Sequence, residues 1–214
     1  MPTFDALLRE SAPPVIAILR GVTPAEVVAI GGALVAAGIR LIEVPLNSPD
    51  PFASIEALQA RFGDEAMIGA GTVLDIASVD RLAATGARLM VAPHTDSAVI
   101  ARAVEHKLEA VPGFFTPSEA FAAIAAGAKR LKLFPASSAG PVHFKALLEV
   151  LPAEVGMWAV GGVDAGNLNQ WIGAGAEGVG LGGALYRPGD TAAEVAAKAE
   201  RIVAAWDKTG RDRQ

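Results

Sequence analysis

Lys132 is the residue of this chain whose type and setting point most directly to chemistry. It lies in the segment RLKLFP at residues 130–135, and this short apolar run predicts a buried strand with a lysine at its centre. An isolated ammonium group is costly to bury, so such a lysine must be paired or neutral. A neutral lysine amine is a nucleophile. The alternatives are a structural ion pair, or a lysine whose stem lies along the core with its head in solvent.

Strand-like and helix-like segments alternate along the rest of the chain and must position this lysine. A short amphipathic helix is expected over residues 3–10. Eight units of about 20–26 residues follow, which predicts a (β/α)8 TIM barrel with a short N-terminal helix, formed as a single domain over residues 1–214. The alternative is a doubly wound sheet, but no Gly-x-Gly-x-x-Gly motif follows the first strand. The apolar strand cores begin near Val15, Leu41, Met67, Leu89, Glu109, Leu131, Met157 and Glu177.

Capping residues mark where the intervening helices start and stop. Ser, Thr or Asp, often with a following Pro, predicts helix starts near residues 23, 48, 75, 96, 116 and 164. Glycine can adopt the left-handed conformation that closes a helix, and it predicts helix ends at residues 38, 86, 127 and 175. The connections are therefore short, as in a barrel.

Polar residues that face the barrel axis near the C-terminal ends of the strands are candidates for an active site, because barrel enzymes place catalytic groups there. Strand alternation puts Arg20, Glu43 and Lys132 on axis-facing positions near this mouth, and Thr72 ends the third strand. Charges of opposite sign that converge on one mouth favour an active site. The alternative is a buried ion-pair cluster, which is often no more stable than an apolar core.

Two glycine pairs follow the last two strands and indicate a phosphate site. Gly161-Gly162 and Gly182-Gly183 stand where barrel enzymes frequently bind phosphate, and the missing Cβ lets the backbone approach an anion. Each pair alone could simply form a turn. Together they favour a phosphorylated small-molecule ligand.

Composition excludes several other classes of function. The net charge of −5 and the scattered basic residues argue against a nucleic-acid surface. The longest apolar stretch, residues 27–39, is too short to span a bilayer, and the N-terminus lacks a secretory signal pattern. There is no cysteine, and the histidines His94, His106 and His143 lack ligand spacing, so we expect no metal or other cofactor. A cytoplasmic location fits these features.

Five motifs taken together resemble one family, the class I aldolases of 2-keto-3-deoxy-6-phosphosugar acids. They are AILRG at 17–21, IEVPLNS at 42–48, GAGTV at 69–73, LKLFP at 131–135 and AVGG at 159–162. The resemblance implies that Lys132 forms a Schiff base with the substrate ketone and that Glu43 is the general acid and base. It also implies that Arg20, Thr72, Gly162, Gly182 and Gly183 bind substrate, that pyruvate is a product, that no metal takes part, and that the chain forms a homotrimer.

Two positions bear on the sugar acid that is cleaved, because the phosphogluconate and phosphogalactonate substrates differ in configuration at C4. Val160 and the segment PLNS at 45–48 are similar to the phosphogalactonate type of the family. A phosphogluconate or dual specificity is the alternative, and Val160 would then only pack the barrel. Gly183 departs from the family, whose members usually carry Gly-Ser here. A serine hydroxyl that could donate to phosphate is therefore missing in this chain, while the backbone N–H remains. A phosphosugar isomerase or epimerase, or a non-catalytic binding barrel, would be more distant alternatives.

Overall fold

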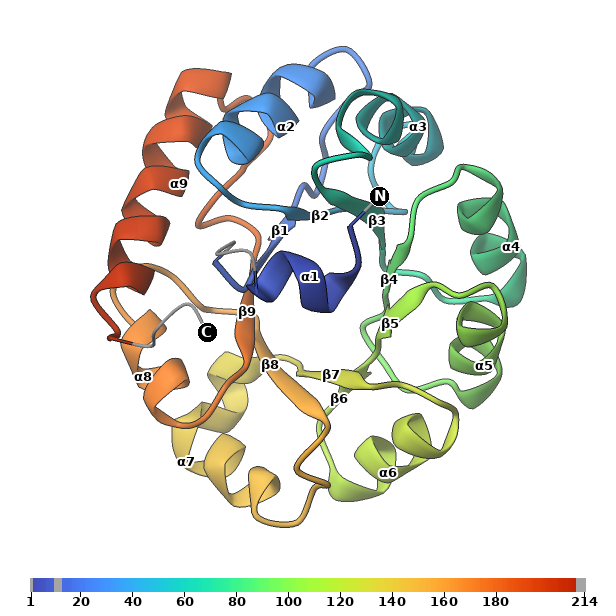
Figure 1. Cartoon of the computed structure of the whole chain (residues 1–214), viewed down its shortest axis with the longest axis vertical. Helices are drawn as coiled ribbons and strands as arrows, with labels where there is room; N and C mark the ends of the chain where they lie inside the picture. Colours follow the sequence, from blue (N-terminus) through green and yellow to red (C-terminus); the bar gives the residue numbers. More distant parts are fainter. Residues whose placement is uncertain (1, 10–12, 211–214) are drawn as a thin grey trace.

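The computed structural model describes residues 2–9 and 13–210. Its strands surround one axis and the helices form an outer ring, as Figure 1 shows. The strands are β1 (Val15–Ile18), β2 (Leu41–Pro45), β3 (Met67–Gly71), β4 (Leu89–Val91), β5 (Glu109–Val111), β6 (Gly113–Phe114), β7 (Arg130–Leu133), β8 (Gly156–Val160) and β9 (Gly178–Leu181). The helices are α1 (Phe4–Arg9), α2 (Val27–Ala36), α3 (Pro51–Phe62), α4 (Ile76–Ala84), α5 (Ser97–Glu105), α6 (Pro117–Ala125), α7 (Ala136–Leu148), α8 (Leu168–Gly173) and α9 (Ala192–Asp207).

All strand pairs are parallel, and their order closes the predicted barrel. The sheet runs β5-β4-β3-β2-β1-β9-β8-β7-β6. β5 and β6 follow one another directly in sequence and are separated by Pro112 alone, so they are two halves of one barrel strand. Proline has no N–H for the ladder, which explains the break. Its carbonyl still accepts a hydrogen bond of 2.9 Å from the Lys132 N–H. The predicted TIM barrel with eight strands is confirmed, and its fifth strand is interrupted at Pro112.

Most helix boundaries follow the predicted caps. Asp75 and Asp96 accept hydrogen bonds from the first turns of α4 and α5, and Thr116 forms a capping box with Glu119 at the start of α6. The glycines at 38, 86, 127 and 175 have positive φ values between 78° and 102°, as their helix-ending role requires. Three starts are later than predicted. The turns after residues 23, 48 and 164 come first, and α2, α3 and α8 begin only at Val27, Pro51 and Leu168.

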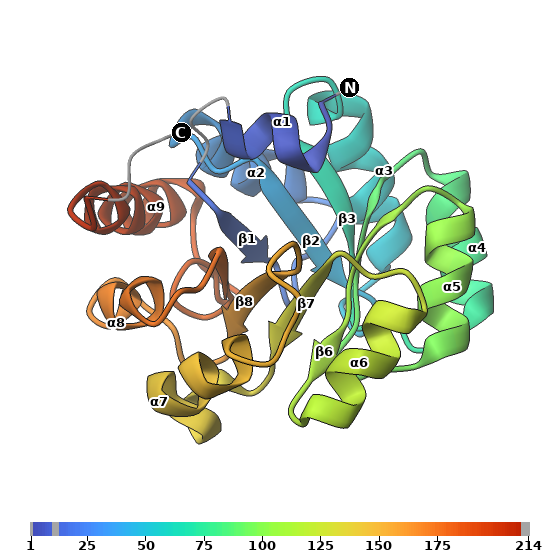
Figure 2. The ribbon, with the colours of Figure 1, turned by 60° about the horizontal axis from the view of Figure 1, so that its bottom comes forward.

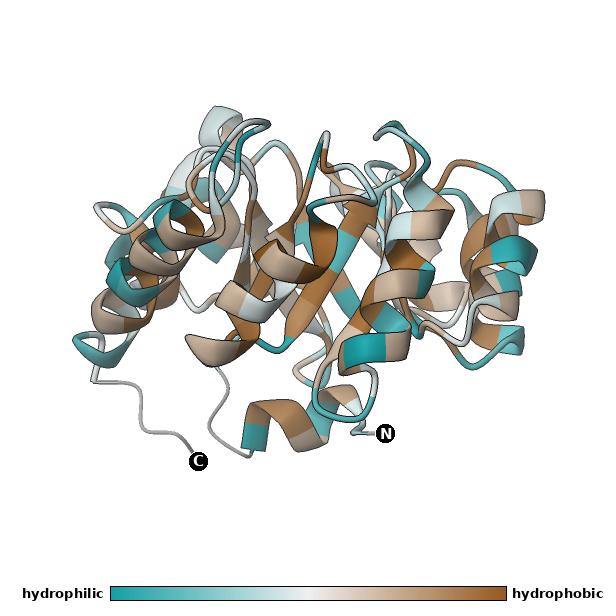
Figure 3. Ribbon diagram, turned by 90° about the horizontal axis from the view of Figure 1, so that it is seen from above, coloured by the Kyte–Doolittle hydropathy of each residue, from teal (hydrophilic) through white to brown (hydrophobic). Residues whose placement is uncertain are grey.

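Helix α1 covers the N-terminal end of the barrel (Figure 2). It spans Phe4–Arg9, slightly less than the predicted residues 3–10, of which Glu10 lies outside the described residues. Phe4 packs edge-on against Trp158 with ring centroids 5.5 Å apart. The interior cluster below the mouth also contains Ile16, Leu41, Met67, Leu89, Val91 and Val111. The hydrophobic strands and the hydrophilic outer surfaces of the helices are visible in Figure 3.

The expected alternation of strand faces is confirmed. Ile16 and Leu41 belong to the cluster inside the barrel, whereas Ala17, Ile42 and Leu131 pack between strands and helices. On β7, Arg130 and Lys132 are two residues apart and therefore share the inner face. Arg130 lies toward α1 and Lys132 one step closer to the C-terminal mouth. None of the helices in the described ranges has the length and apolar character needed to cross a membrane.

Candidate active site

Lys132 and Glu43 are buried charges inside the barrel. Lys132 on β7 is 5% exposed and Glu43 on β2 is 2% exposed. The Lys132 Nζ lies 5.0 Å from the ring centroid of Phe134, so part of its surroundings is aromatic. Strand alternation positions both side chains on the inner face, as the sequence predicts.

The barrel interior moves both pKa values toward neutrality. Burial lowers the pKa of Lys132 to about 8, opposed by the charge of Glu43 and assisted by that of Arg20. Burial raises the pKa of Glu43 to about 7, opposed by the charges of Lys132 and Arg20. Because the two groups interact, their titrations are coupled. A nucleophilic amine and a carboxyl group that can exchange protons are thus available near pH 7–8.

The Glu43 carboxylate is tightly enclosed and incompletely satisfied. A Cβ at Gly71 would lie only 1.9 Å from the Glu43 Oε2, so only glycine at 71 leaves room for this carboxylate. The same Oε2 is buried and has no hydrogen-bond partner among the described residues. A buried oxygen without a partner is costly in a merely structural role. Proton exchange with a bound molecule would give this oxygen a function.

Arg20 follows β1 and is held at the mouth by two polar side chains. One guanidinium nitrogen donates to the Asn47 Oδ1 at 2.5 Å, and the other donates to the Thr72 hydroxyl at 3.4 Å. Thr72 has a φ of 55°, a left-handed conformation that non-glycine residues adopt rarely and often at functional sites. The next residue, Gly21, donates its N–H to the Ser48 Oγ at 2.9 Å. The loops after β1, β2 and β3 are therefore linked around Arg20.

A pocket of about 490 Å³ opens at the mouth, a size that suits a small molecule. It contains the two glycine pairs, Arg20 and Val160 from the predicted set. Gly161 and Gly162 have φ values of 96° and 78°, and a Cβ on Gly162 would lie 2.6 Å from the Ser137 Cβ. The remaining lining residues are Ile18, Phe134, Val163, Asp164, Gly180, Ala184 and Arg187. Lys132, Glu43 and Thr72 do not line this pocket directly.

The histidines do not form a metal site with other residues. Within the described ranges no group of three or more His, Asp or Glu side chains could hold a metal ion. His94 is exposed after β4, and His143 stacks on Phe115 with ring centroids 5.7 Å apart. The ring of His106 is 2.8 Å from the Asp80 carboxylate at the surface of α4 and α5. That the function of this chain needs no metal stays a prediction.

Two residues of this mouth were given no individual role by the sequence pattern, although Asn47 lies in the quoted segment PLNS at 45–48. Asn47 contacts Arg20, and Arg187 lines the pocket beside Gly183. Both stand in loops, where no periodicity tells in which direction a side chain points. Their position just after a strand's C-terminal end is the signal that could have found them.

Comparison with known proteins points to one family. The model of the KDPG and KHG aldolases matches residues 5–201. A protein of Escherichia coli (strain K12) named 2-dehydro-3-deoxy-6-phosphogalactonate aldolase is 49% identical over 90% of this chain and 94% of its own length. A probable enzyme of the same name from Rhizobium meliloti (strain 1021) is 48% identical over 91% of this chain and 92% of its own.

Solved structures agree with these relatives. A structure described as native KDPGal has a TM-score of 0.91 at 48% identity, covering 92% of this chain and 95% of its own. A KDPG aldolase from Legionella pneumophila, with pyruvate captured as a covalent carbinolamine, has a TM-score of 0.79 at 25% identity, covering 95% and 96%. This barrel, with its buried lysine and glutamate beneath a glycine-lined pocket, belongs to the family of KDPG and KHG aldolases and is an aldolase.

Proposed function

We propose that this aldolase cleaves 2-dehydro-3-deoxy-6-phosphogalactonate to pyruvate and D-glyceraldehyde 3-phosphate through a Schiff base on Lys132. The observation that carries this proposal is the burial of Lys132 beside Glu43, which lowers the pKa of the amine to about 8 and raises the pKa of the carboxyl group to about 7. An exposed lysine with a pKa of about 10.4 would be almost entirely protonated at neutral pH.

The covalent steps follow from a neutral amine. The Lys132 Nζ adds to the C2 ketone and forms a carbinolamine, which loses water to give an iminium. The C4 hydroxyl then gives up its proton, the C3–C4 bond breaks, and its electron pair moves toward the iminium nitrogen. D-Glyceraldehyde 3-phosphate leaves, and an enamine remains. Protonation at C3 and addition of water release pyruvate and regenerate the amine.

Glu43 is the proposed proton carrier in these steps. Its carboxyl group would help expel water from the carbinolamine, accept the C4 hydroxyl proton directly or through one water, and return a proton to C3. A pKa near 7 suits a group that must both accept and donate. The unpartnered Glu43 Oε2 supports this role, since this buried acceptor has no hydrogen-bond partner among the described residues.

The pocket at the mouth is the proposed phosphate site. Gly161, Gly162, Gly182 and Gly183 bring backbone to its surface without side chains in between, and Arg20 adds a positive charge. Because Arg20 lines this pocket, we assign it to the phosphate end of the substrate. Thr72 is held against the Arg20 guanidinium and would orient it and contact the substrate.

The choice of the galactonate epimer is supported by similarity. The two relatives that carry this name are 48–49% identical to this chain, whereas relatives named for phosphogluconate from Treponema pallidum (strain Nichols) and Pseudomonas aeruginosa are 28% and 32% identical. Val160 lines the pocket with an aliphatic side chain that offers no hydrogen bond to a C4 hydroxyl. A site that fits the C4 hydroxyl in one configuration can strongly reject the epimer that carries this hydroxyl in the other configuration.

The assembly and location of the enzyme are further parts of the proposal. We infer a single-domain chain that assembles as a homotrimer. A designed cage made by fusing symmetric oligomeric domains contains a chain 48% identical to this one, with a TM-score of 0.92, which supports an oligomer. A multiply charged phosphosugar acid does not cross membranes unaided, which favours action in the cytoplasm.

Steady-state kcat/KM values on the two pure C4 epimers, followed by pyruvate release, test the substrate assignment. We expect the galactonate epimer to be preferred by at least about tenfold, which corresponds to a 1.4 kcal/mol difference in transition-state binding. A preference for the gluconate epimer would overturn the assignment. Val160→Thr should shift the ratio toward the gluconate epimer, and an unchanged ratio would limit Val160 to packing.

A further inference from the structure

Arg187 is a cation in the candidate phosphate pocket to which the sequence motifs assign no role. It lies in the loop after β9 and lines the pocket together with Arg20 and the glycine pairs. The side chain is exposed, so a ligand can reach it. Its position four residues after Gly183 places it at the rim of the pocket.

The Arg187 side chain occupies the space next to Gly183. Its Nε donates a hydrogen bond of 3.1 Å to the Gly183 carbonyl. A Cβ built on Gly183 would lie 3.5 Å from the same Nε, which is ordinary van der Waals contact. A side chain at position 183 would therefore stand against the Arg187 guanidinium. Glycine at 183 leaves this space to the arginine.

The backbone that carries Arg187 is fixed on both sides. Leu185 and Tyr186 are buried, and the Tyr186 hydroxyl lies 3.2 Å from the Glu26 Oε1. The Arg187 N–H donates to the Asp190 Oδ2 at 2.7 Å. A Cβ at Gly21 would lie 2.7 Å from the Pro188 Cγ, so the loops after β1 and β9 touch. Phosphate binding would then require the Arg187 side chain to become ordered, but not the loop that carries it.

The guanidinium nitrogens of the two arginines have different partners. Those of Arg20 donate to Asn47 and Thr72, as described above. Arg187 makes no ion pair among residues 2–9 and 13–210, and its Nε contact leaves the terminal nitrogens for a ligand. Asp164, the one acidic residue of the lining, accepts hydrogen bonds from the Gly166 and Asn167 N–H groups through its Oδ1.

We propose that Arg187 binds the substrate phosphate and supplies the side-chain contact that glycine at position 183 cannot provide. This inference rests on the proposed function and adds a recognition residue to it. A guanidinium presents two parallel N–H donors to phosphate oxygens, and charge-assisted pairs of this kind are stronger than neutral hydrogen bonds. Arg187 is thus a binding residue remote from the bond that breaks.

The test compares Arg187→Ala with Arg201→Ala, a matched change at an exposed arginine of α9. We expect Arg187→Ala to raise the KM for the phosphorylated substrate about tenfold, within the range of a charge-assisted hydrogen bond. The inhibition constant of inorganic phosphate should rise in parallel, whereas borohydride trapping of pyruvate should be unchanged. Arg201→Ala should alter none of these.

Gly183→Ser gives a second, independent readout. A serine hydroxyl at this position can donate to the same phosphate, so Gly183→Ser should recover part of the KM lost in Arg187→Ala. An Arg187→Ala enzyme with KM and phosphate inhibition within twofold of the parent would overturn the assignment. Failure of the proposed function is distinguishable, because it would abolish pyruvate trapping in the unmodified enzyme, whereas phosphate binding could still be measured.

Discussion

At the scale of single residues, the site depends on two groups whose ordinary pKa values lie about six units apart and are brought close together by burial. Desolvation acts on Lys132 and Glu43 in opposite directions, since one becomes charged by gaining a proton and the other by losing it. Sequence alternation predicted both residues and Arg20, because a strand fixes which side chains face inward. Asn47 and Arg187 could not be predicted in this way, since their loops lack a fixed period.

The pH dependence of kcat/KM should report this coupled pair. The reactive amine of Lys132 becomes more populated as pH rises through about 8, and the Glu43 carboxylate as pH rises through about 7. We therefore expect kcat/KM to increase from pH 6 and to level off above about pH 8.5. The apparent pKa values of this profile belong to the coupled pair rather than to either residue alone. Rates measured at constant ionic strength provide the profile. A continued rise through pH 10 would mean that the lysine pKa is not lowered.

Glu43→Gln separates proton transfer from binding. The amide is nearly isosteric but cannot exchange protons, so we expect turnover to fall by roughly 10²–10⁴-fold while pyruvate binding is largely retained. Single-turnover cleavage and borohydride trapping measure the two effects. Glu56→Gln, at an exposed position of α3, is the matched control. Near-normal turnover in Glu43→Gln would remove Glu43 from the mechanism.

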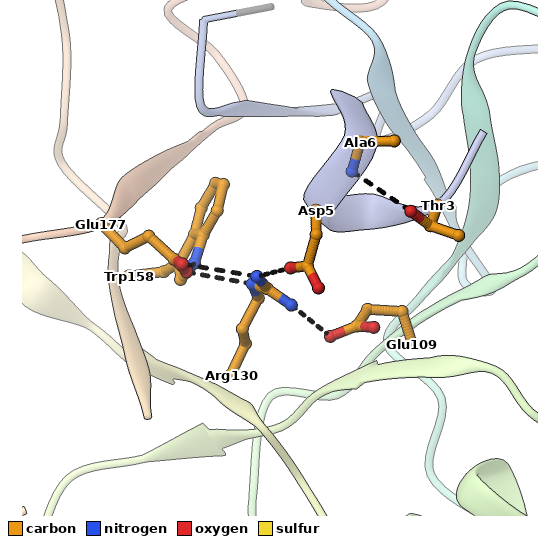
Figure 4. A network of polar contacts seen from close by, with 7 residues as sticks. All are labelled: Thr3, Asp5, Ala6, Glu109, Arg130, Trp158 and Glu177. Carbon is orange, nitrogen blue, oxygen red and sulfur yellow. Dashed lines mark hydrogen bonds and ion pairs between the residues drawn. The ribbon is translucent and has the colours of Figure 1, made fainter. Parts of the chain in front are cut away.

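At the scale of elements, the end of the barrel opposite the mouth is closed by α1 and by a charge network centred on Arg130. This arginine donates to Asp5 at 2.5 Å, to Glu109 at 3.0 Å and to Glu177 at 3.0 Å. The Trp158 Nε1 donates to the same Glu177 carboxylate at 2.6 Å, and Figure 4 shows the whole network. The network joins α1, β5, β7, β8 and the segment before β9. Arg130 therefore fixes α1 to the end of β7 that lies opposite the mouth, on the same strand as Lys132.

Removal of the central charge should destabilise the fold. Arg130→Ala leaves the partly exposed carboxylates of Asp5, Glu109 and Glu177 without their shared cation. Loss of one partner of a fully buried pair costs about 3–5 kcal/mol, and solvent screening of these carboxylates places the cost at the low end of that range. We expect a decrease of about 3 kcal/mol in the free energy of unfolding, measured by urea denaturation. The exposed Arg201→Ala should change it by no more than about 0.5 kcal/mol. A decrease below about 1 kcal/mol for Arg130→Ala would show that the network adds little stability.

The elements also show where prediction from sequence stops. Caps and glycines located the starts of α4, α5 and α6 and the ends of several helices, since those signals are local. The break at Pro112 and the late starts of α2, α3 and α8 were not predicted. The break follows from the missing N–H of Pro112, whereas at the three helices the capping signal marks a turn that precedes the first helical residue.

At the scale of the whole molecule, side chains alternate between the inner and outer faces of eight barrel strands. Closure of the barrel brings the C-terminal ends of these strands together at one mouth, where residues distant in sequence meet. Arg20, Asn47 and Thr72 are brought into contact although they are up to 52 positions apart. The regular sequence of strands and helices predicted this architecture well. The 1–214 domain boundary and the homotrimer stay predictions, since both concern more than the fold of the described residues.

The mechanism predicts that the reaction proceeds without a divalent ion. The iminium nitrogen accepts the electron pair of the C3–C4 bond. In a metal-dependent reaction, a bound metal ion would stabilise this developing negative charge instead. Exhaustive EDTA treatment followed by gel filtration should leave kcat within twofold of its original value. Loss of activity on chelation, recovered on addition of a divalent ion, would contradict the Schiff-base account.

The most direct test of that account asks which of the six lysines reacts. Lys107, Lys129, Lys145 and Lys208 are exposed, and Lys198 pairs with Asp190. Lys132 is the buried lysine among these six, and burial lowers its pKa to about 8. Borohydride added with pyruvate should leave one covalent adduct, mapped by peptide mass to Lys132. Lys129→Arg should label normally, and Lys132→Arg should be unlabelled and inactive. An adduct on another lysine, or an active enzyme that forms none, would contradict the central claim.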